Sequence, residues 1–352
     1  MSLLKKTLQQ IQPQNAVTRK NARNRLDQLV MPHWALGDLM DLSLNLAGMT
    51  HSIKPVINNK AIIIMAGDHG VVAEGVSKYP AEVTSQMIQN FVNGGAGINA
   101  LAKQADCEII VVDMGVNADL KALVNQGKII DKKVALGTEN IAIGAAMHRS
   151  MAQKAVESGI EIANQLNDRI DIFGTGDMGI GNTTPSTAIA AIITGKPVHL
   201  LTGRGTGLND RQLSHKIKII EQALEVNQPD PTDGLDILAK IGGFEIGGIT
   251  GLILGAAANQ KPVVIDGFIS GAAALIACHL MPFVRDYIIC AHRSVEPGHK
   301  IMQANLACKP LLDLNLRLGE GTGAALAMSL IDASVAILTD VKTFDEAAVR
   351  CE

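Results

Sequence analysis

The stretch AIIIMAGDHG, residues 61–70, decides the predicted fold, because an aliphatic run over 61–67 ends in glycine and is followed by polar residues. Short apolar runs rich in Ile and Val are typical of strands buried on both faces in a parallel sheet. Five further runs of this kind follow, at residues 108–115, 171–174, 198–203, 262–267 and 286–292. Helical patterns lie between several of them, at residues 81–91, 145–166, 186–193, 210–222, 248–257 and 271–278. The alternation predicts an α/β protein with a doubly wound, mainly parallel, Rossmann-like sheet.

The two ends of the chain differ from this central region. Residues 28–47 and 323–338 are apolar at helical spacing, and no strand-like run lies around them. We therefore expect a small helical domain built from both termini, residues 1–49 plus 313–352, beside a large domain over residues 50–312. The polar turn residues of 228–234 predict a loop.

Composition excludes several classes of function. The 352 residues include 31 basic and 34 acidic side chains, a formal net charge of -3, so no basic surface favours nucleic acid. Aromatic residues make up only 3% of the chain, too few for platforms that stack bases. Apolar stretches such as residues 268–280 are shorter than the roughly 20 residues that span a bilayer, so we expect no membrane partner.

The N-terminus and the cysteines indicate the cellular setting. No apolar run follows residues 1–6, so we expect no secretory signal and a cytoplasmic location. The five cysteines (Cys107, Cys278, Cys290, Cys308 and Cys351) have no C-x-x-C spacing and are predicted to be reduced thiols.

Polar residues follow each predicted strand, and the carboxyl ends of parallel strands meet at one edge of a sheet, where ligands bind. The segment 174–179 has the pattern G-x-G-x-x-G, which can aim backbone N–H groups at a phosphate. An NAD site needs an acidic residue about 20 positions later, and none lies between Met178 and Asn209. Arg204 leaves an NADP site open, and close helix–strand packing is the other interpretation of these glycines.

A second glycine-rich turn, residues 203–207, suggests with the first a phosphorylated ligand held without a Walker lysine. Lys216 lies in the next predicted helix, where it either reaches an anion or is a solvated surface lysine. Near the C-terminus, Glu320 stands within a glycine cluster before a helix. It is either a general base or a carboxylate that interacts with that helix N-terminus.

Other motifs are absent. His69, His292 and His299 lie in different segments and do not have the spacing of metal ligands. There is also no G-x-S-x-G nucleophile elbow, which disfavours a serine hydrolase.

Six segments together carry a resemblance that covers nearly the whole chain: residues 66–72, 174–184, 203–208, 265–267, 292–299 and 316–323. They closely resemble the nicotinate-nucleotide:dimethylbenzimidazole phosphoribosyltransferase family. The resemblance implies transfer of phosphoribose from nicotinate mononucleotide to the lower-ligand base of a cobamide, with release of nicotinate. It also implies a homodimer with a large Rossmann-like domain and a small helical domain, and neither a cofactor nor a metal.

The same resemblance implies roles for particular residues. Glu320 corresponds to the catalytic base, and Asp177 stands where family members typically have a second acidic residue, a glutamate. The nicotinate mononucleotide site is expected to include Gly176, Gly179, Gly181, Asn182, Thr183, Gly203, Gly205, Lys216, Asp266 and Ser294. The base pocket is expected to include Ser77, Tyr79, Gln86 and Leu318, with Ser77 and Gln86 as its main polar contacts.

The change from glutamate to Asp177 shortens the side chain by about one methylene, and a reacting geometry can be sensitive to ~1 Å. The identity of the accepted base is therefore open. One alternative is a paralogue that transfers phosphoribose to phenol or p-cresol, as one subunit of a heterodimer. A weaker alternative, from the glycine pattern alone, is an NADP-dependent oxidoreductase.

Overall fold

The computed structural model describes residues 1–205 and 207–350, so Thr206 and Cys351 lie outside the described residues. Its main sheet has six strands in the order β3-β2-β1-β4-β5-β6, and every neighbouring pair is parallel. The chain builds outward from β1 on one side and from β4 on the other, which confirms the doubly wound α/β fold. A crevice for a ligand is expected beyond the carboxyl ends of β1 and β4, where the strand order reverses. The strands are β1 (Lys60–Gly67), β2 (Cys107–Gly115), β3 (Ile130–Asp131), β4 (Ile172–Met178), β5 (Val263–Ile265) and β6 (Ile288–Cys290).

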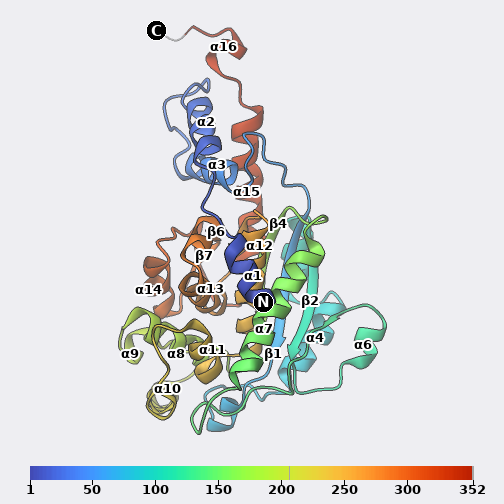
Figure 1. Cartoon of the computed structure of the whole chain (residues 1–352), viewed down its shortest axis with the longest axis vertical. Helices are drawn as coiled ribbons and strands as arrows, with labels where there is room; N and C mark the ends of the chain where they lie inside the picture. Colours follow the sequence, from blue (N-terminus) through green and yellow to red (C-terminus); the bar gives the residue numbers. More distant parts are fainter. Residues whose placement is uncertain (206, 351–352) are drawn as a thin grey trace.

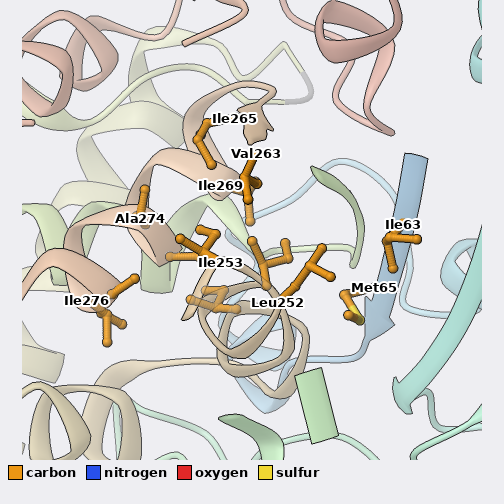
Figure 2. Close-up of a cluster of buried hydrophobic side chains, with 14 of the residues drawn as sticks. Ile63, Met65, Leu252, Ile253, Val263, Ile265, Ile269, Ala274 and Ile276 are labelled. Carbon is orange, nitrogen blue, oxygen red and sulfur yellow. The ribbon is translucent and has the colours of Figure 1, made fainter. Parts of the chain in front are cut away.

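The central strands are buried along their whole length, as their continuous apolar sequences require. All eight residues of β1 and all seven of β4 are buried. Figure 2 shows Leu252 and Ile253 of the central helix α12 (Phe244–Ala258) among side chains of β1, β5 and α13 (Phe268–Leu280). This core consists mainly of aliphatic side chains, in agreement with the aromatic content of 3%.

Helices cover both faces of the sheet, and each of the six predicted helices is present with shifted ends. The part of the chain around the main sheet also contains the short 3₁₀ helices η1 (Gly70–Glu74) and η2 (Pro282–Tyr287). Its α-helices are α4 (Val83–Val92), α5 (Gly97–Gln104), α6 (Lys121–Asn125), α7 (Arg149–Leu166), α8 (Thr183–Thr194), α9 (Val198–Leu201), α10 (Asp210–Asn227), α11 (Gly234–Ile241), α12 (Phe244–Ala258), α13 (Phe268–Leu280) and α14 (Pro297–Asn305).

Helices from the two ends of the chain meet in a second hydrophobic cluster. The helices involved are α2 (Ala16–Leu26), α3 (Asp38–Met49) and α15 (Thr322–Asp340), and the short α16 (Phe344–Ala347) follows. Figure 1 shows α2 and α3 beside the far end of α15, above the sheet. The first helix, α1 (Leu3–Gln10), instead packs on α7 and α12. The division into residues 1–49 plus 313–352 and residues 50–312 stays a prediction.

Several sequence-based predictions are wrong. Residues 198–203 do not form a strand: they begin with the helix α9, in which Val198 and Leu201 are buried while His199 and Leu200 are exposed, a helical i, i+3 pattern. The predicted helix at residues 28–47 begins only at Asp38. Its first part contains turns and a bridge from Leu29 to Thr343. The two-residue β3 and the small parallel sheet of β7 (His292–Ser294) and β8 (Leu312–Leu316) are not predicted from the sequence.

Helix α15 is long and apolar enough to cross a membrane, with 19 residues and a mean hydropathy of 1.6. Among the described residues it alone has both properties, and the sequence analysis does not anticipate it. It packs on α3, α5 and β4, which makes it a core helix of this fold.

The contact between α7 and α12 depends on glycines, because the two backbones touch. A Cβ added at Gly251 would overlap the carbonyl oxygen of Val156, so this close approach excludes any side chain. We expect Gly251→Ala to lower the free energy of unfolding by about 2–3 kcal/mol, since the overlap outweighs the better helix propensity of alanine. Equilibrium unfolding in guanidinium measures this difference.

Gly144→Ala is the matched control, because a Cβ at Gly144 would meet nothing within 4 Å. This substitution should change the free energy of unfolding by less than about 1 kcal/mol. Equal stability of the two variants would contradict the packing argument.

Candidate active site

A cavity of about 590 Å³ lies beyond the carboxyl ends of β4 and β5, at the predicted edge of the sheet. The segment after β1, helix α4, the start of α13, β7 and the loop before α15 supply its walls. Eleven of the sequence-predicted residues line it: Ser77, Tyr79, Asp177, Gly179, Gly181, Asn182, Thr183, Gly205, Ser294, Leu318 and Glu320. The other five, Gly176, Gly203, Lys216, Asp266 and Gln86, do not.

Glu320 lies on the tight loop between β8 and α15, and its side chain is only 6% exposed. Its Oε2 accepts a hydrogen bond of 3.3 Å from the backbone N–H of Ile98, in the first turn of α5. Burial raises the pKa of Glu320, the Ile98 N–H lowers it in part, and the charge of Asp266 raises it further. Glu320 is therefore a carboxylate beside a cavity with a greater proton affinity than an exposed glutamate.

Asp266 holds the loop that carries Glu320. Its Oδ2 accepts from the backbone N–H of Gly321 at 3.2 Å, and its Oδ1 accepts from those of Gly323 at 2.7 Å and Ala324 at 3.1 Å. The side chain is completely buried and so caps the N-terminus of α15 from within the core. Because both oxygens have protein partners, Asp266 acts on the position of Glu320.

Glycines in β4 make room for the same loop. A Cβ at Gly176 would lie 2.7 Å from the carbonyl oxygen of Glu320, and one at Gly174 would overlap the side chain of Ile62. Glu320 itself has a φ of +63°, and the neighbouring Gly321 has a φ of +92°, both in the left-handed region. Of the two interpretations of the G-x-G-x-x-G pattern, close packing is therefore the correct one for Gly174 and Gly176.

Asp177 lies at the end of β4 and is 7% exposed. Its Oδ2 accepts a hydrogen bond of 3.0 Å from the side-chain amide of Asn182. Burial, and after it the charge of Asp266, raises the pKa of Asp177 to about 8, against the opposing effect of the Asn182 hydrogen bond. At neutral pH Asp177 is therefore mainly protonated and able to donate a hydrogen bond.

The opposite end of the cavity is suited to an anion. Thr183 begins α8, and its Oγ1 accepts a hydrogen bond of 2.7 Å from Nζ of Lys216 in α10. Lys216 is 1% exposed, which excludes the interpretation as a solvated surface lysine. Burial lowers its pKa to about 8, an effect that the charge of Glu296 opposes. A helix N-terminus with an adjacent ammonium group is a favourable place for a phosphate.

Glu296 organises the second glycine-rich turn at this end of the cavity. Its Oε1 accepts from the backbone N–H of Gly205 at 3.1 Å, and its own N–H donates to Oγ of Ser294 at 3.3 Å. A Cβ at Gly203 would overlap Oε2 of Glu296, so this position requires glycine. Gly203 thus packs against the side chain of Glu296, while Gly205 lines the cavity.

The predicted base pocket needs one correction, because Gln86 is exposed and does not line the cavity. Val83 and Met87 line it instead, four residues apart on one face of α4. Tyr79 and Leu318 stand at its rim with exposures of 53% and 60%. Together these side chains form a largely apolar wall of a kind that suits a flat aromatic ligand.

Sequence reasoning missed part of the cavity wall. His292 and Glu296 lie within the segment 292–299, and Arg317 lies within the segment 316–323. The sequence therefore indicates their segments but not their positions in the cavity wall. The i, i+4 spacing in α4 could have identified Val83 and Met87 as a pair, but it does not separate them from Gln86, which is three residues after Val83. The missed residues are Val76, Val83, Met87, Met178, Ile180, Gly267, Phe268, Ile269, His292, Glu296, Arg317 and Gly319.

Within residues 1–205 and 207–350, no group of three or more His, Cys, Asp or Glu side chains is placed to hold a metal ion.

Comparisons with known proteins agree over almost the whole chain. A family model described as phosphoribosyltransferase matches residues 11–349. The nicotinate-nucleotide–dimethylbenzimidazole phosphoribosyltransferase of Desulfotalea psychrophila is 64% identical over 350 residues, which cover 99% of both chains. The protein of the same name from Syntrophotalea carbinolica is 56% identical over 349 residues, again 99% of both chains. The crystal structure of CobT from Thermus thermophilus matches with a TM-score of 0.91 and 41% identity, covering 96% of this chain and 100% of that one.

The raised pKa of Asp177 predicts a pH-dependent cost to stability. Between pH 4 and pH 8 the folded protein keeps this proton and the unfolded chain does not, so wild-type stability falls as pH rises through this window. Asp177→Asn removes this contribution. The stability of the variant relative to wild type should therefore grow by up to about 1.4 kcal/mol per pH unit between about pH 4 and 8, and level off above.

Chemical denaturation at a series of pH values measures this difference. Glu225→Gln serves as the control, because Glu225 is exposed on α10, and its stability curve should run parallel to that of wild type. A parallel curve for Asp177→Asn as well would refute the assignment of a buried, protonated Asp177.

Proposed function

The chain belongs to the phosphoribosyltransferase family whose model spans residues 11–349, and from this membership we propose that it transfers phosphoribose from nicotinate mononucleotide to 5,6-dimethylbenzimidazole. The products are nicotinate and the α-ribosyl phosphate of the base, an intermediate of cobamide synthesis. The observation that carries this proposal is the buried carboxylate of Glu320 beside the cavity, held by Ile98 and by the cap that Asp266 provides.

The reaction exchanges one carbon–nitrogen bond for another. The lone pair of one benzimidazole nitrogen attacks the anomeric carbon from the face opposite nicotinate. The bond to the pyridinium nitrogen breaks, and its electron pair stays with nicotinate, so the ring leaves uncharged and needs no general acid. The new benzimidazolium then loses its N–H proton to Glu320, which acts as general base. The configuration at the anomeric carbon is inverted.

The two ends of the cavity divide the substrates. The phosphate lies at the N-terminus of α8, where Thr183 and the buried Lys216 provide positive potential. Gly179, Gly181, Asn182, Gly205 and Ser294 line the cavity around this end and contact the nucleotide. The aromatic base lies against the apolar wall of α4, with Ser77, Tyr79 and Leu318 around it.

Asp177 is proposed to act as a hydrogen-bond donor in the cavity. Because its pKa is about 8, it is protonated at neutral pH and donates a hydrogen bond, and Glu320 is left as the base. This division needs only one ionised carboxylate beside the base. The chain is proposed to act as a homodimer, the arrangement that the family resemblance implies, and to be located in the cytoplasm.

The two alternatives have less support. The named relatives refer to dimethylbenzimidazole and not to a phenol, so transfer to phenol or p-cresol within a heterodimer is not favoured. The NADP-dependent oxidoreductase depends on Gly174 and Gly176, whose free space is taken up by Ile62 and by the backbone of Glu320.

The function is tested with the purified chain, nicotinate mononucleotide and a panel of dimethylbenzimidazole, purine, phenol and p-cresol. We expect nicotinate release and α-ribosyl phosphate formation with dimethylbenzimidazole. Glu320→Gln should lower kcat by a factor of about 10²–10⁴, the usual contribution of a general base, and change the KM for nicotinate mononucleotide little. Chromatography with mass detection measures both products.

Wild-type kcat/KM should also fall as pH decreases, because protonation of Glu320 removes the base. This loss should begin above the ordinary carboxylate range near 4.3, since the pKa of Glu320 is raised. Glu221→Gln, an exposed substitution on α10, is the control and should behave as wild type. Full activity of Glu320→Gln would eliminate the proposed base, and transfer to phenols alone would eliminate the proposed acceptor.

The phosphate end is tested separately with two lysines of α10. Lys216→Gln should raise the KM for nicotinate mononucleotide roughly 10- to 100-fold, the equivalent of a lost hydrogen bond to a charged group. Lys218→Gln is the matched control, because Lys218 is exposed two residues along the same helix. Steady-state kinetics measure KM, and circular dichroism establishes that both variants fold. A similar KM for the two folded variants would exclude Lys216 from the phosphate site.

A further inference from the structure

Two cysteines meet at the edge of the main sheet, outside the active-site cavity. Cys290 is the last residue of β6, and Cys308 follows α14. The backbone N–H of Cys290 donates a hydrogen bond of 3.2 Å to Sγ of Cys308, and this sulfur lies 4.0 Å from the carbonyl oxygen of Ile288. The two side chains also influence each other's pKa. Both thiols are free.

One of these sulfurs is open to small molecules. Cys308 is partly buried and lines a separate cavity of about 720 Å³ between α3 and the β6 edge of the sheet. Cys290 lines the same cavity and is buried, with 2% exposure. The charged side chains that line this cavity are equally divided between basic and acidic groups: Arg19, Arg285, Lys309, Asp38, Asp41 and Asp286.

We propose that Cys290 and Cys308 form an oxidation site at which a hydroperoxide converts the two thiols into a disulfide that alters the active-site wall. Cys308 is the attacking sulfur, because it is the more exposed of the two and accepts a hydrogen bond from the backbone N–H of Cys290, and the side chain and N–H of Cys290 lower its pKa. The same contact and burial raise the pKa of the Cys290 thiol, which suits the resolving partner.

The chemistry needs one peroxide molecule. The Cys308 thiolate attacks a peroxide oxygen, the O–O bond breaks, and hydroxide leaves and takes up a proton as water. Cys308 is then a sulfenic acid. The Cys290 sulfur displaces the sulfenic hydroxyl, which departs as a second water with the Cys290 proton, and the S–S bond forms. Two thiols are oxidised by two electrons, and one hydrogen peroxide is reduced to two waters.

The disulfide would act on the cavity through the chain between the two cysteines. This segment contains His292, Ser294 and Glu296, all of which line the active-site cavity. Its strand β7 pairs with β8, which leads directly into the Glu320 loop. An S–S bond of about 2.05 Å would fix the end of β6 against the segment after α14 and close the chain between them into a covalent loop.

The test treats reduced wild-type protein with hydrogen peroxide and digests it without reduction. Trypsin separates the two cysteines at Arg293 and Lys300, so a disulfide joins two peptides that mass spectrometry identifies. We expect a Cys290–Cys308 peptide that dithiothreitol abolishes. Release of nicotinate should fall about tenfold or more after oxidation and recover on reduction, because displacements of ~1 Å in a site can cost two orders of magnitude.

Three variants provide the controls. Cys290→Ser and Cys308→Ser should give no linked peptide and keep their activity in peroxide. Cys107→Ser should respond as wild type, because Cys107 lies in β2, and burial raises its pKa to about 11. Cys278 on α13 is the competing thiol, since it lies near enough to Cys308 to influence it electrostatically.

Each outcome decides the proposal. No linked peptide, or a Cys278–Cys308 peptide in its place, overturns the site. A Cys290–Cys308 peptide with unchanged nicotinate release overturns its effect on the cavity. The activity measurement rests on the proposed phosphoribosyl transfer, whereas the peptide does not. Absence of transfer in reduced protein therefore counts against the proposed function, and the linked peptide still decides the oxidation site.

Discussion

The interaction on which the rest of the site depends is the capping of α15 by Asp266. A carboxylate without exposed surface is costly to bury, and it persists here because three backbone N–H groups donate to its two oxygens. These N–H groups belong to Gly321, which follows Glu320 and is the N-cap of α15, and to the first turn of that helix. The loop therefore cannot move away from β4 without leaving a buried carboxylate and several donors unpaired. This constraint holds Glu320 in a left-handed conformation that glycine would adopt more easily.

The sequence predicts the fold well where a pattern is continuous and long. Complete burial makes β1 recognisable as a run of aliphatic residues, and α7 shows in its periodicity. Helix α12 is buried on nearly all sides and shows only in its length. It fails at residues 198–203, because a helical turn and a short buried strand have the same apolar composition over four residues. For the site, the sequence indicates the correct edge of the sheet and the correct loops. It does not separate residues that face the cavity from residues that support its walls. Asp177 and Gly179 line the cavity whereas Asp266 and Gly176 do not, and only three-dimensional contacts distinguish the two pairs.

The acidic residues near the cavity are useful because they are not equivalent. Asp266 receives hydrogen bonds from the backbone, Asp177 receives one from an amide, and Glu320 receives one from the start of α5. Burial raises the pKa of each, and mutual repulsion adds to the effect in Asp177 and Glu320. Asp177 and Glu320 each have a single donor, and the repulsion is relieved by protonation of Asp177, whose pKa burial and the charge of Asp266 raise to about 8. A neutral donor and a charged acceptor thus coexist in one cavity.

This charge distribution also suits the proposed transfer. Nicotinate mononucleotide brings a positive pyridinium ring, and a cavity with several ionised carboxylates would stabilise that ring and oppose its departure as a neutral molecule. Because Asp177 is protonated, fewer negative charges in the cavity stabilise the pyridinium ring of the bound substrate. Positive charge moves during the reaction from the pyridinium to the sugar and then to the benzimidazole. An ionised Glu320 on the side of the incoming base favours this movement, and it takes up the proton in the last step. The electrostatic contribution of the site is therefore greater for the transition state than for the nucleotide substrate, which is the requirement for catalysis.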